Sequence, residues 1–272
     1  MRSNRARVRA TLVAATLVVP LTLTACGGDD DAPSPAGAGL PQGDDPVDLD
    51  PADFTASSDN PYFPLEPGRQ WTYRETDKSG TSLKVVVTVT TETHEVANGV
   101  VARVVRDTVT EDGEIVEDTF DWYAQDGEGN VWYLGEDTAE LEDGEIATRE
   151  GSFEAGVDGA LPGIIMPAEP EAGLSYRQEY YEGEAEDNGA VLALGQQADT
   201  AHGPFDDVLL TADTITLEPD VLEYKLYAPG VGLVLTLDIS GGGGREELVA
   251  TKLIDDATAR AAGTAPLGTP YQ

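Results

Sequence analysis

Two aromatic-rich stretches of similar design restrict the fold of this chain most strongly. Residues 119–135 read TFDWYAQDGEGNVWYLG, and residues 223–237 read EYKLYAPGVGLVLTL. Each has two runs of β-forming residues around a glycine-containing turn, which is typical of a β-hairpin. Aligning Tyr123 with Tyr227 gives an offset of 104 residues, and the same offset places Asn98-Gly99 on His202-Gly203. The chain is therefore predicted to contain a duplicated β unit.

The segments around these hairpins alternate between apolar and polar side chains. Leucine, valine or isoleucine stands at every second position of residues 83–89 and 233–239, and no long segment has an apolar stripe with a helical period. This pattern predicts an all-β fold. We expect an antiparallel barrel or sandwich of about 10–12 strands, built from two similar halves. A barrel has the advantage of leaving no exposed sheet edge, but the sequence does not distinguish the two.

The first 26 residues have the pattern of an export signal. Residues 1–9 carry four arginines and no acid, and residues 10–25 form an apolar run that is short for a membrane span. The run ends in Leu23-Thr24-Ala25-Cys26, which resembles the lipobox of bacterial lipoproteins. That resemblance implies a signal peptide over residues 1–25, lipidation of Cys26 and membrane attachment through the lipid. The alternative is an ordinary cleaved signal followed by a chance cysteine.

Charge and cysteine content restrict the mature chain further. Cys26 is the only cysteine, which excludes disulfide bonds within the chain. All four basic residues of the signal are lost on cleavage, which leaves 12 basic residues against 51 acidic ones. A surface this acidic argues against binding nucleic acid through a basic face. The acidity is explained either by solubility or a saline habitat, or by the attraction of divalent or cationic ligands.

Composition divides the mature chain into five parts. Residues 26–60 are rich in Gly, Asp, Pro, Ala and Ser, which predicts a flexible tether carrying the lipid. Residues 61–150 and 174–256 are the two β halves, and residues 257–272 are expected to be a tail with a short helical stretch at most.

Residues 151–173, between the halves, are rich in glycine and proline but also apolar. This crossover shows neither strand nor helix periodicity, although it contains Leu161, Ile164, Ile165 and Met166. An apolar loop must be covered or must cover something. It is interpreted either as a plug packed against the sheet or as a lid over a ligand cavity, and methionine suits such an adaptable surface.

One turn is a candidate cation site. Asp126, Glu128 and Asn130 stand at alternate positions and Asp137 is twelfth in the count, which is the spacing of oxygen ligands in a calcium loop. Val131, however, occupies the place where such a loop needs glycine. The alternative is a hairpin turn that simply uses polar residues.

Other chemistry in the sequence is sparse. A second cluster combines tyrosines with acids, as sugar binding or glycoside hydrolysis requires; its members are Tyr176, Glu179, Tyr180, Tyr181, Glu182, Glu184, Glu186 and Asp187. The chain has no Gly-x-Ser-x-Gly motif, and His94 lacks the second histidine of a zinc-protease helix. His94 and His202 are expected to be structural or solvated. We expect no cofactor and no catalytic set.

Several segments resemble those of a group of uncharacterised bacterial exported proteins and lipoproteins. They are NPYFPL at residues 60–65 with Pro67-Gly68 and Trp71, DWYAQD at residues 121–126, GNVWY at residues 129–133 and YAPGVG at residues 227–232. The resemblance covers residues 60–253 and implies an envelope location and a β-rich body. It supplies no catalytic residues.

These patterns lead to two functional hypotheses. The first is a membrane-anchored extracytoplasmic lipoprotein, not an enzyme, whose β body binds a lipid, another apolar ligand or a small molecule. The alternative is an envelope protein that binds or hydrolyses polysaccharide through the clustered tyrosines and glutamates.

Overall fold

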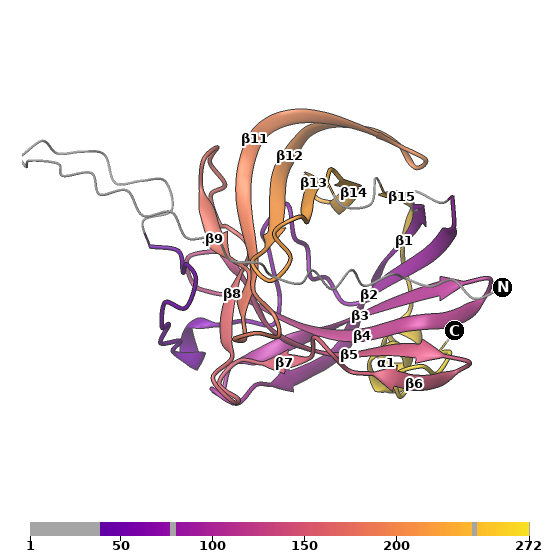
Figure 1. Ribbon diagram of the computed structural model, residues 1–272, viewed down its shortest axis with the longest axis horizontal. Helices are drawn as coiled ribbons and strands as arrows, with labels where there is room; N and C mark the ends of the chain where they lie inside the picture. The colour runs from indigo at the N-terminus through magenta and orange to yellow at the C-terminus, as the bar shows by residue number, and fades with distance from the viewer. Residues whose placement is uncertain (1–38, 77–79, 241–243, 272) are drawn as a thin grey trace, which may run out of the picture. The chain divides into compact units, whose positions relative to one another are not determined.

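A computed structural model describes residues 39–76, 80–240 and 244–271, and these residues form an all-β antiparallel fold (Figure 1). The predicted signal peptide and Cys26 lie outside the described residues. Within them, fifteen strands form one sheet: β1 (Arg69–Thr76), β2 (Ser82–Glu95), β3 (Val101–Glu111), β4 (Glu114–Gln125), β5 (Val131–Glu142), β6 (Glu145–Thr148), β7 (Phe153–Glu154), β8 (Leu161–Met166), β9 (Ser175–Arg177), β10 (Glu179–Tyr180), β11 (Asp187–Thr200), β12 (Gly203–Ile215), β13 (Leu222–Ala228), β14 (Gly232–Asp238) and β15 (Arg245–Leu253).

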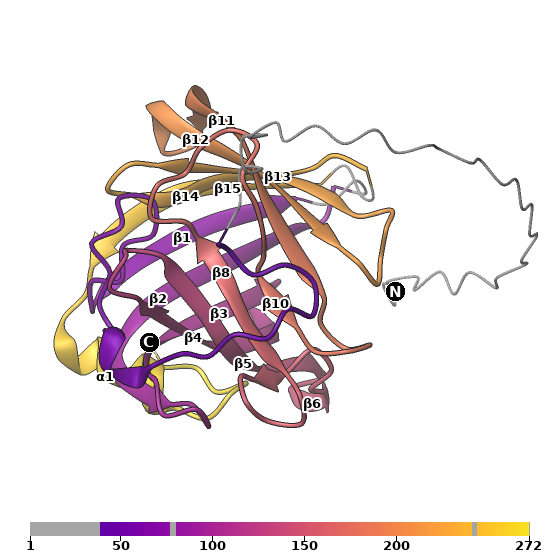
Figure 2. The same ribbon diagram turned by 90° about the vertical axis from the view of Figure 1, so that its left-hand side faces the viewer.

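The sheet curls into a nearly closed barrel (Figure 2). Its strands follow the order β10-β8-β5-β4-β3-β2-β1-β15-β14-β13-β12-β11-β9, with β6 and β7 paired to β5 outside this path. The two end strands, β9 and β10, are separated in the chain by Gln178 alone, so the two edges of the sheet meet there. Of the two expected architectures, the structure has the barrel.

Two residues explain how the edges can meet. A Cβ on Gly163 of β8 would lie 2.4 Å from the carbonyl oxygen of Arg177, so only glycine permits this approach. The buried guanidinium of Arg177 donates to Pro162 O from Nε (3.2 Å) and Nη2 (2.7 Å), and from Nη1 to Gly43 O (2.7 Å) and Asp45 O (2.8 Å). Arg177 thereby joins β8, β9 and the N-terminal segment at the seam.

The N-terminal segment lies along the barrel wall. A 3-10 helix at Pro51–Asp53 precedes a bridge in which Thr55 exchanges 2.9 Å backbone hydrogen bonds with Gln125. Four apolar side chains pack on the main core: Leu40, Val47, Leu49 and Phe54. The prediction of a flexible tether is therefore wrong for residues 40–60, because a few apolar side chains suffice when a finished sheet offers them a surface. Residues 26–38 lie outside the described residues.

The C-terminal segment is also packed against the barrel. Helix α1 (Asp256–Thr264) contacts β2 and β3, and its Ala259 and Ala262 are buried. Asp255 caps the helix by accepting a 3.0 Å hydrogen bond from the backbone of Thr258. The expected short helix is present, but residues 257–271 form part of the folded body. Among the described residues, no helix combines the length and apolar character that crossing a membrane requires.

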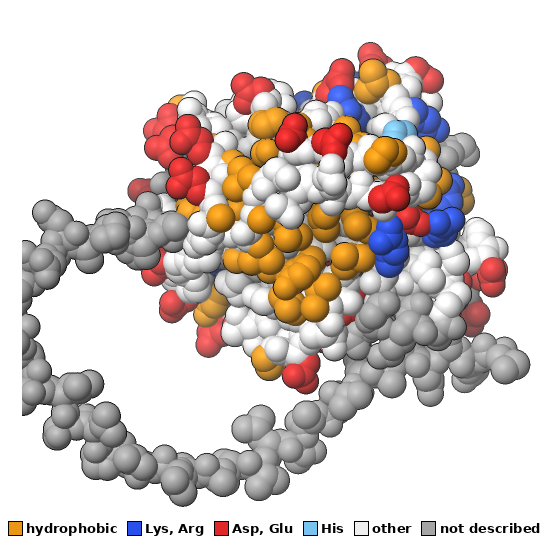
Figure 3. Space-filling view, turned by 90° about the horizontal axis from the view of Figure 1, so that it is seen from above, with side chains coloured by type: hydrophobic (Ala, Val, Ile, Leu, Met, Phe, Trp, Pro, Cys, Tyr) orange, Lys and Arg blue, Asp and Glu red, His pale blue; other side chains and the backbone are white. Residues whose placement is uncertain are grey.

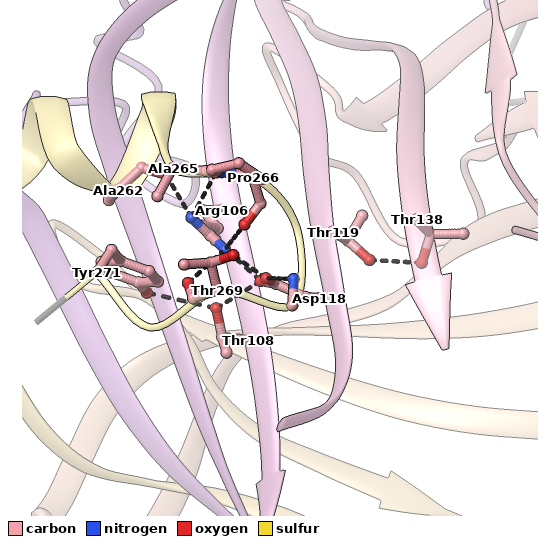
Figure 4. Close-up of polar contacts among 11 residues, drawn as sticks. Arg106, Thr108, Asp118, Thr119, Thr138, Ala262, Ala265, Pro266, Thr269 and Tyr271 are labelled. Carbon is pink, nitrogen blue, oxygen red and sulfur yellow. Dashed lines mark hydrogen bonds and ion pairs between the residues drawn. The ribbon is translucent and has the colours of Figure 1, made fainter. Parts of the chain in front are cut away.

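A buried ion pair fastens this segment (Figure 4). The side chains of Arg106 on β3 and Asp118 on β4 are both fully buried and form a bidentate pair. Arg106 also donates hydrogen bonds to four backbone carbonyls of the C-terminal segment, those of Ala262 (3.0 Å), Ala265 (3.1 Å), Pro266 (3.2 Å) and Thr269 (3.2 Å). Asp118 in turn accepts from Gly268 N at 2.8 Å. We call this arrangement the C-terminal clamp.

The two aromatic hairpins occupy corresponding places in consecutive meanders, β2-β3-β4-β5 and β11-β12-β13-β14. The register of β4 with β5 shifts between Trp122 and Tyr123, and that of β13 with β14 shifts between Leu226 and Tyr227. These positions are related by the offset of 104 residues seen in the sequence. The turns differ in length, and an internal duplication stays a prediction.

Candidate functional site

The interior of the barrel contains a cavity of about 600 Å³. This volume lies within the range of small-molecule sites, which is roughly 300–1,000 Å³. Aromatic side chains form part of its lining: Phe63, Trp71, Tyr73, Tyr123 and Tyr227. Aliphatic side chains form a second part: Leu65, Val87, Val89, Val105, Ile165 and Leu233. Six carboxylates form a third: Glu75, Asp107, Asp121, Glu223, Asp238 and Glu246.

Strand periodicity places these side chains inside. On β1, Trp71, Tyr73 and Glu75 stand at alternate positions and all line the cavity. On β3, Val105 and Asp107 line it, whereas the intervening Arg106 faces outward beneath α1. Each of these strands therefore passes from an apolar side chain to an acid two residues further on.

The aromatic rings of β1 are anchored through their polar atoms. Trp71 Nε1 donates to the carbonyl of Val231 at 2.8 Å, and the Tyr73 hydroxyl donates to that of Leu233 at 3.0 Å. Because backbone carbonyls satisfy these donors, the rings are fixed on the cavity wall as apolar surface.

The NPYFPL segment lines the cavity from the N-terminal side. Phe63 and Leu65 belong to the lining, and the Phe63 ring meets that of Tyr123 edge-on with centroids 5.0 Å apart. Asn60 holds the segment in place because its buried amide donates to Pro167 O at 3.0 Å and to Gly129 O at 3.3 Å.

Three of the lining carboxylates have strongly perturbed acidity. Burial, followed by the charges of Asp121 and Glu246, raises the pKa of Asp107 well above its ordinary value. Burial is also the main cause that raises the pKa of Asp121 to about 7 and that of Glu246 to about 7. The Oδ1 atom of Asp107 is buried and has no hydrogen-bond partner within the described part of the chain.

A tyrosine connects Asp121 to a further acid. The Tyr133 hydroxyl lies 2.8 Å from Asp121 Oδ1 and 2.9 Å from Glu136 Oε2. Burial, then the charge of Asp121, raises the pKa of Glu136 to about 8. A hydroxyl has one proton, so it can donate to only one carboxylate at a time. The second short contact is satisfied when Glu136 is protonated and donates to the tyrosine oxygen.

The two basic side chains of the cavity are already paired. Lys225 Nζ lies 2.8 Å from Asp213 Oδ2 and 3.7 Å from Glu223 Oε2. Arg245 Nη2 lies 3.1 Å from Glu247 Oε2. Among the described residues, neither cation forms an ion pair with Asp107, Asp121 or Glu246, so no basic side chain of this set neutralises these three acids.

The predicted lid is a strand of the barrel wall. Residues 161–166 form β8, which pairs with β5 through Ile164–Trp132 and Met166–Val131. Ile164 and Met166 are buried in the main core and Leu161 is half-buried. Ile165 does line the cavity, but as part of a fixed wall. The absence of a strand pattern misled the sequence analysis because Pro162 and Gly163 interrupt the apolar run at the seam.

The structure does not assemble the predicted cation site. Asp126 Oδ1 accepts hydrogen bonds from the backbone N–H groups of Glu128 (3.0 Å), Gly129 (2.8 Å) and Asn130 (2.9 Å). Its Oδ2 accepts from Asn130 Nδ2 and Trp132 Nε1. Asp137 lies six residues into β5, about 20 Å beyond the turn at strand spacing, and pairs with Arg149. The described residues contain no group of three or more His, Cys, Asp or Glu side chains arranged to hold a metal ion.

The cluster of tyrosines and acids is divided. Glu182 and Glu184 are exposed on a turn, whereas burial raises the pKa of Glu179 and, to about 6, that of Asp187. The Tyr176 ring is buried against Gly189, where a Cβ would lie 2.4 Å from it. The cluster therefore forms no single aromatic groove.

The two histidines pack against aromatic rings. His94 stacks on Trp122 with centroids 4.1 Å apart, and His202 stacks on Phe205 at 5.8 Å. These contacts agree with the expected structural roles.

Sequence reasoning missed Asp107 and Asp121. Both occur in alternating strands, and Asp107 shares the face of Val105 and Val109 rather than that of the polar neighbours. An acid in phase with the apolar face of a strand is the signal that would have found Asp107, whereas Asp121 shares its phase with Thr119 and Tyr123 and carries no such signal.

The surface of the protein also has an apolar feature. Leu192 and Leu194 of β11 are exposed. Figure 3 shows hydrophobic side chains gathered near the centre of the face seen from above, with acidic and basic side chains near their edge. The cavity combines an aromatic and aliphatic wall with convergent polar groups, so it is the better candidate for a ligand site.

Comparison with known proteins found no matching family model and no matching curated protein. Three solved structures are similar. A "putative lipoprotein" from Parabacteroides distasonis has a TM-score of 0.38 and 14% identity, covering 70% of this chain and 98% of its own. A "putative exported protein" with a YmcC-like fold from Bacteroides fragilis has a TM-score of 0.39 and 15% identity, with the same coverage. A β-barrel-like protein of domain of unknown function DUF1849 from Brucella abortus has a TM-score of 0.34 and 12% identity, covering 69% and 98%. At these TM-scores the similarities carry no argument about function.

Proposed function

We propose that this chain is an exported, lipid-anchored binding protein that holds a small molecule with a substantial apolar part inside its barrel. The observation that carries the proposal is the cavity of about 600 Å³, with its aromatic and aliphatic wall. Binding of an apolar ligand to a wall of this extent is favourable, because the ligand displaces water from apolar surface.

The location follows from the sequence. The basic start, apolar run and Leu23-Thr24-Ala25-Cys26 pattern support export and attachment through a lipid on Cys26. A protein attached in this way meets its ligand outside the cytoplasm and close to the membrane surface.

Native mass spectrometry tests the proposal directly. The mature chain carrying Cys26→Ser is purified without detergent from its own host, sprayed intact and then extracted with organic solvent. We expect a discrete added mass that the solvent removes. An empty protein that also fails to bind any apolar probe would refute the proposal.

A cavity-filling variant localises the binding. Val105→Trp places a large ring in the cavity and should abolish binding of the co-purified molecule. Val101→Trp is the matched control, because Val101 lies on the same strand but is exposed and outside the cavity. Equal binding by the two variants would place the ligand elsewhere on the protein.

A function in polysaccharide binding or hydrolysis has less support. It was based on the cluster around Tyr180, which the fold divides between an exposed turn and the barrel seam. No observation on these residues favours it over the cavity.

A further inference from the structure

We propose that the ligand of this cavity is a cationic amphiphile, with an organic ammonium group among Asp107, Asp121 and Glu246 and its apolar part against the aromatic and aliphatic wall. This inference rests on the proposed function, because it names the ligand class of the same site. Charge, an unpartnered atom and the aromatic lining support it independently.

The first argument is charge balance. Among the described residues, six carboxylates line the cavity against two basic side chains, Lys225 and Arg245, which are paired with Asp213 and Glu247. No ion pair among the described residues involves Asp107, Asp121 or Glu246. Asp107, Asp121 and Glu246 are half-buried, and carboxylates that are held close together with little water are either protonated or matched by a cation from outside.

The second argument is the unpartnered oxygen. Asp107 is half-buried and lines the cavity, and its Oδ1 atom accepts no hydrogen bond from the described chain. Buried polar atoms in native proteins nearly always have a partner, and an orphan acceptor calls for one. An ammonium N–H supplies both the missing donor and the missing positive charge.

The third argument selects an organic cation. Trp71, Tyr73, Tyr123 and Tyr227 line the same cavity as Asp107. Burial is the main cause that raises the pKa of Tyr73 and of Tyr123, and the charge of Asp107 contributes to both, so its carboxylate lies within electrostatic reach of these rings. Aromatic faces attract organic ammonium groups strongly when water is excluded.

The arrangement along the strands explains why the ligand has two parts. On β1 the lining passes from Trp71 through Tyr73 to Glu75, and on β13 from Tyr227 through Lys225 to Glu223. A molecule that follows this gradient is apolar at one end and charged at the other.

The inference implies that ligand and protons compete. Titratable and charged groups face Asp107 and its neighbours from every packed element. They are Tyr73 and Glu75 on β1, Glu117, Asp121 and Tyr123 on β4, Tyr133 and Glu136 on β5, Glu179 on β10, Asp187 on β11, Asp213 on β12, Glu223, Lys225 and Tyr227 on β13, Asp238 on β14, and Arg245 and Glu246 on β15. The pKa of Asp121 and that of Glu246 are each raised to about 7, so ammonium affinity should fall as the pH falls from 8 to 5.

Calorimetric titration with three probes of equal chain length tests the inference. Decylammonium, decanol and decanoate share a tail and differ in head group, and each is titrated below its micelle concentration at pH 8. We expect decylammonium to bind about tenfold more tightly than decanol, as expected for one carboxylate–cation contact, and decanoate to bind most weakly.

The variants assign the head group. Asp107→Asn should reduce the affinity for decylammonium about tenfold and leave that for decanol unchanged. Asp112→Asn is the matched control, since Asp112 is exposed in the β3–β4 turn at a positive φ of 51° that asparagine also adopts. Thermal melting of each variant verifies that it is folded.

The outcomes separate the two proposals. If none of the three probes binds, the proposed function itself fails. If decanol binds as tightly as decylammonium, the cavity binds apolar molecules and the cationic head group is refuted. If Ca²⁺ binds at the site and Asp107→Asn abolishes that binding, the organic cation is refuted in favour of a metal ion.

Discussion

The C-terminal clamp provides the sharpest test of what holds the barrel wall together. The perturbation is Arg106→Met, which removes the guanidinium but keeps an unbranched apolar side chain. Asp118 then remains fully buried without its cation, and four backbone carbonyls of residues 262–269 lose their donor. Removing one partner of a buried pair costs about 3–5 kcal/mol in free energy of unfolding, because it leaves an uncompensated buried charge.

This cost translates into a measurable melting temperature. For a domain of 150–250 residues, 1 kcal/mol corresponds to a Tm change of roughly 2–4 °C. We therefore expect Arg106→Met to lower the Tm by about 6–20 °C at neutral pH. Circular dichroism at strand wavelengths measures this shift, and limited proteolysis should show earlier cleavage after residue 255, where the clamped segment begins.

A double variant distinguishes the lost pair from lost packing. Arg106→Met combined with Asp118→Leu removes the orphaned carboxylate, and part of the Tm should be recovered. The reasoning is refuted if Arg106→Met lowers the Tm by less than about 3 °C. It is also refuted if the decreases in stability caused by Arg106→Met and by Asp118→Leu simply add in the double variant.

Three further predictions concern the seam, the interior and the aromatic turn. Gly163→Ala should lower the Tm by several degrees and accelerate proteolysis between β8 and β10, because its Cβ would meet backbone 2.4 Å away; unchanged proteolysis would contradict a seam there. Asp121 and Glu136, with pKa values raised to about 7 and about 8, bind more protons in the folded than in the unfolded chain, so stability in urea should fall by roughly 7 kcal/mol between pH 4.5 and 8, with about 3 kcal/mol from Asp121 and about 4 kcal/mol from Glu136; a rise would reverse the assigned sign. Asp126→Ala should cost about 1–3 kcal/mol, measured by urea unfolding, because five donors lose their acceptor; an addition of Ca²⁺ should not change the result for the unmodified chain.

Period-two alternation was enough to predict the strands and the fold class. It reports which side chains share a face, and it did so correctly for residues 83–89 and for both aromatic hairpins. It carries no information on which distant strands pair. The closure at Gln178 depends on the close approach of Gly163 to Arg177, residues that are ordinary in their local sequence. The choice of barrel over sandwich therefore needed the structure.

The ends of the chain were misjudged for a related reason. Residues 40–60 and 257–271 have few apolar side chains, and taken alone they could not offset the entropy of ordering. The barrel offers both segments a surface that already exists, and Arg177 and Arg106 satisfy their backbone carbonyls. Each arginine looks like an isolated charge in an acidic sequence. Their roles are visible only in the folded structure, where each arginine of the barrel wall contacts the backbone carbonyls of a terminal segment.

Of the site residues predicted from the sequence, only Ile165 is among the described residues that line the cavity. Ile165 was one of the four candidate lid residues and does line the cavity, whereas the turn at Asp126 proved to be a self-contained hydrogen-bonded turn. With 51 acids in the chain, local clusters such as residues 179–187 carry little weight. The acids that matter are single residues on different strands, and only the register of the barrel collects them.

The acids inside the barrel oppose stability, and this leads to a last prediction. A raised pKa means that ionisation of Asp107 is costly in the folded state. Asp107→Asn keeps the shape and removes that cost, so the variant should melt at a higher temperature than the unmodified chain at pH 8. The two should melt at similar temperatures near pH 3, where the carboxyl is largely protonated in the folded and the unfolded chain. The same variant should lose affinity for decylammonium. A residue that lowers stability and is needed for binding is the expected signature of a functional site. A variant that is destabilised at both pH values would instead show that Asp107 has a structural role.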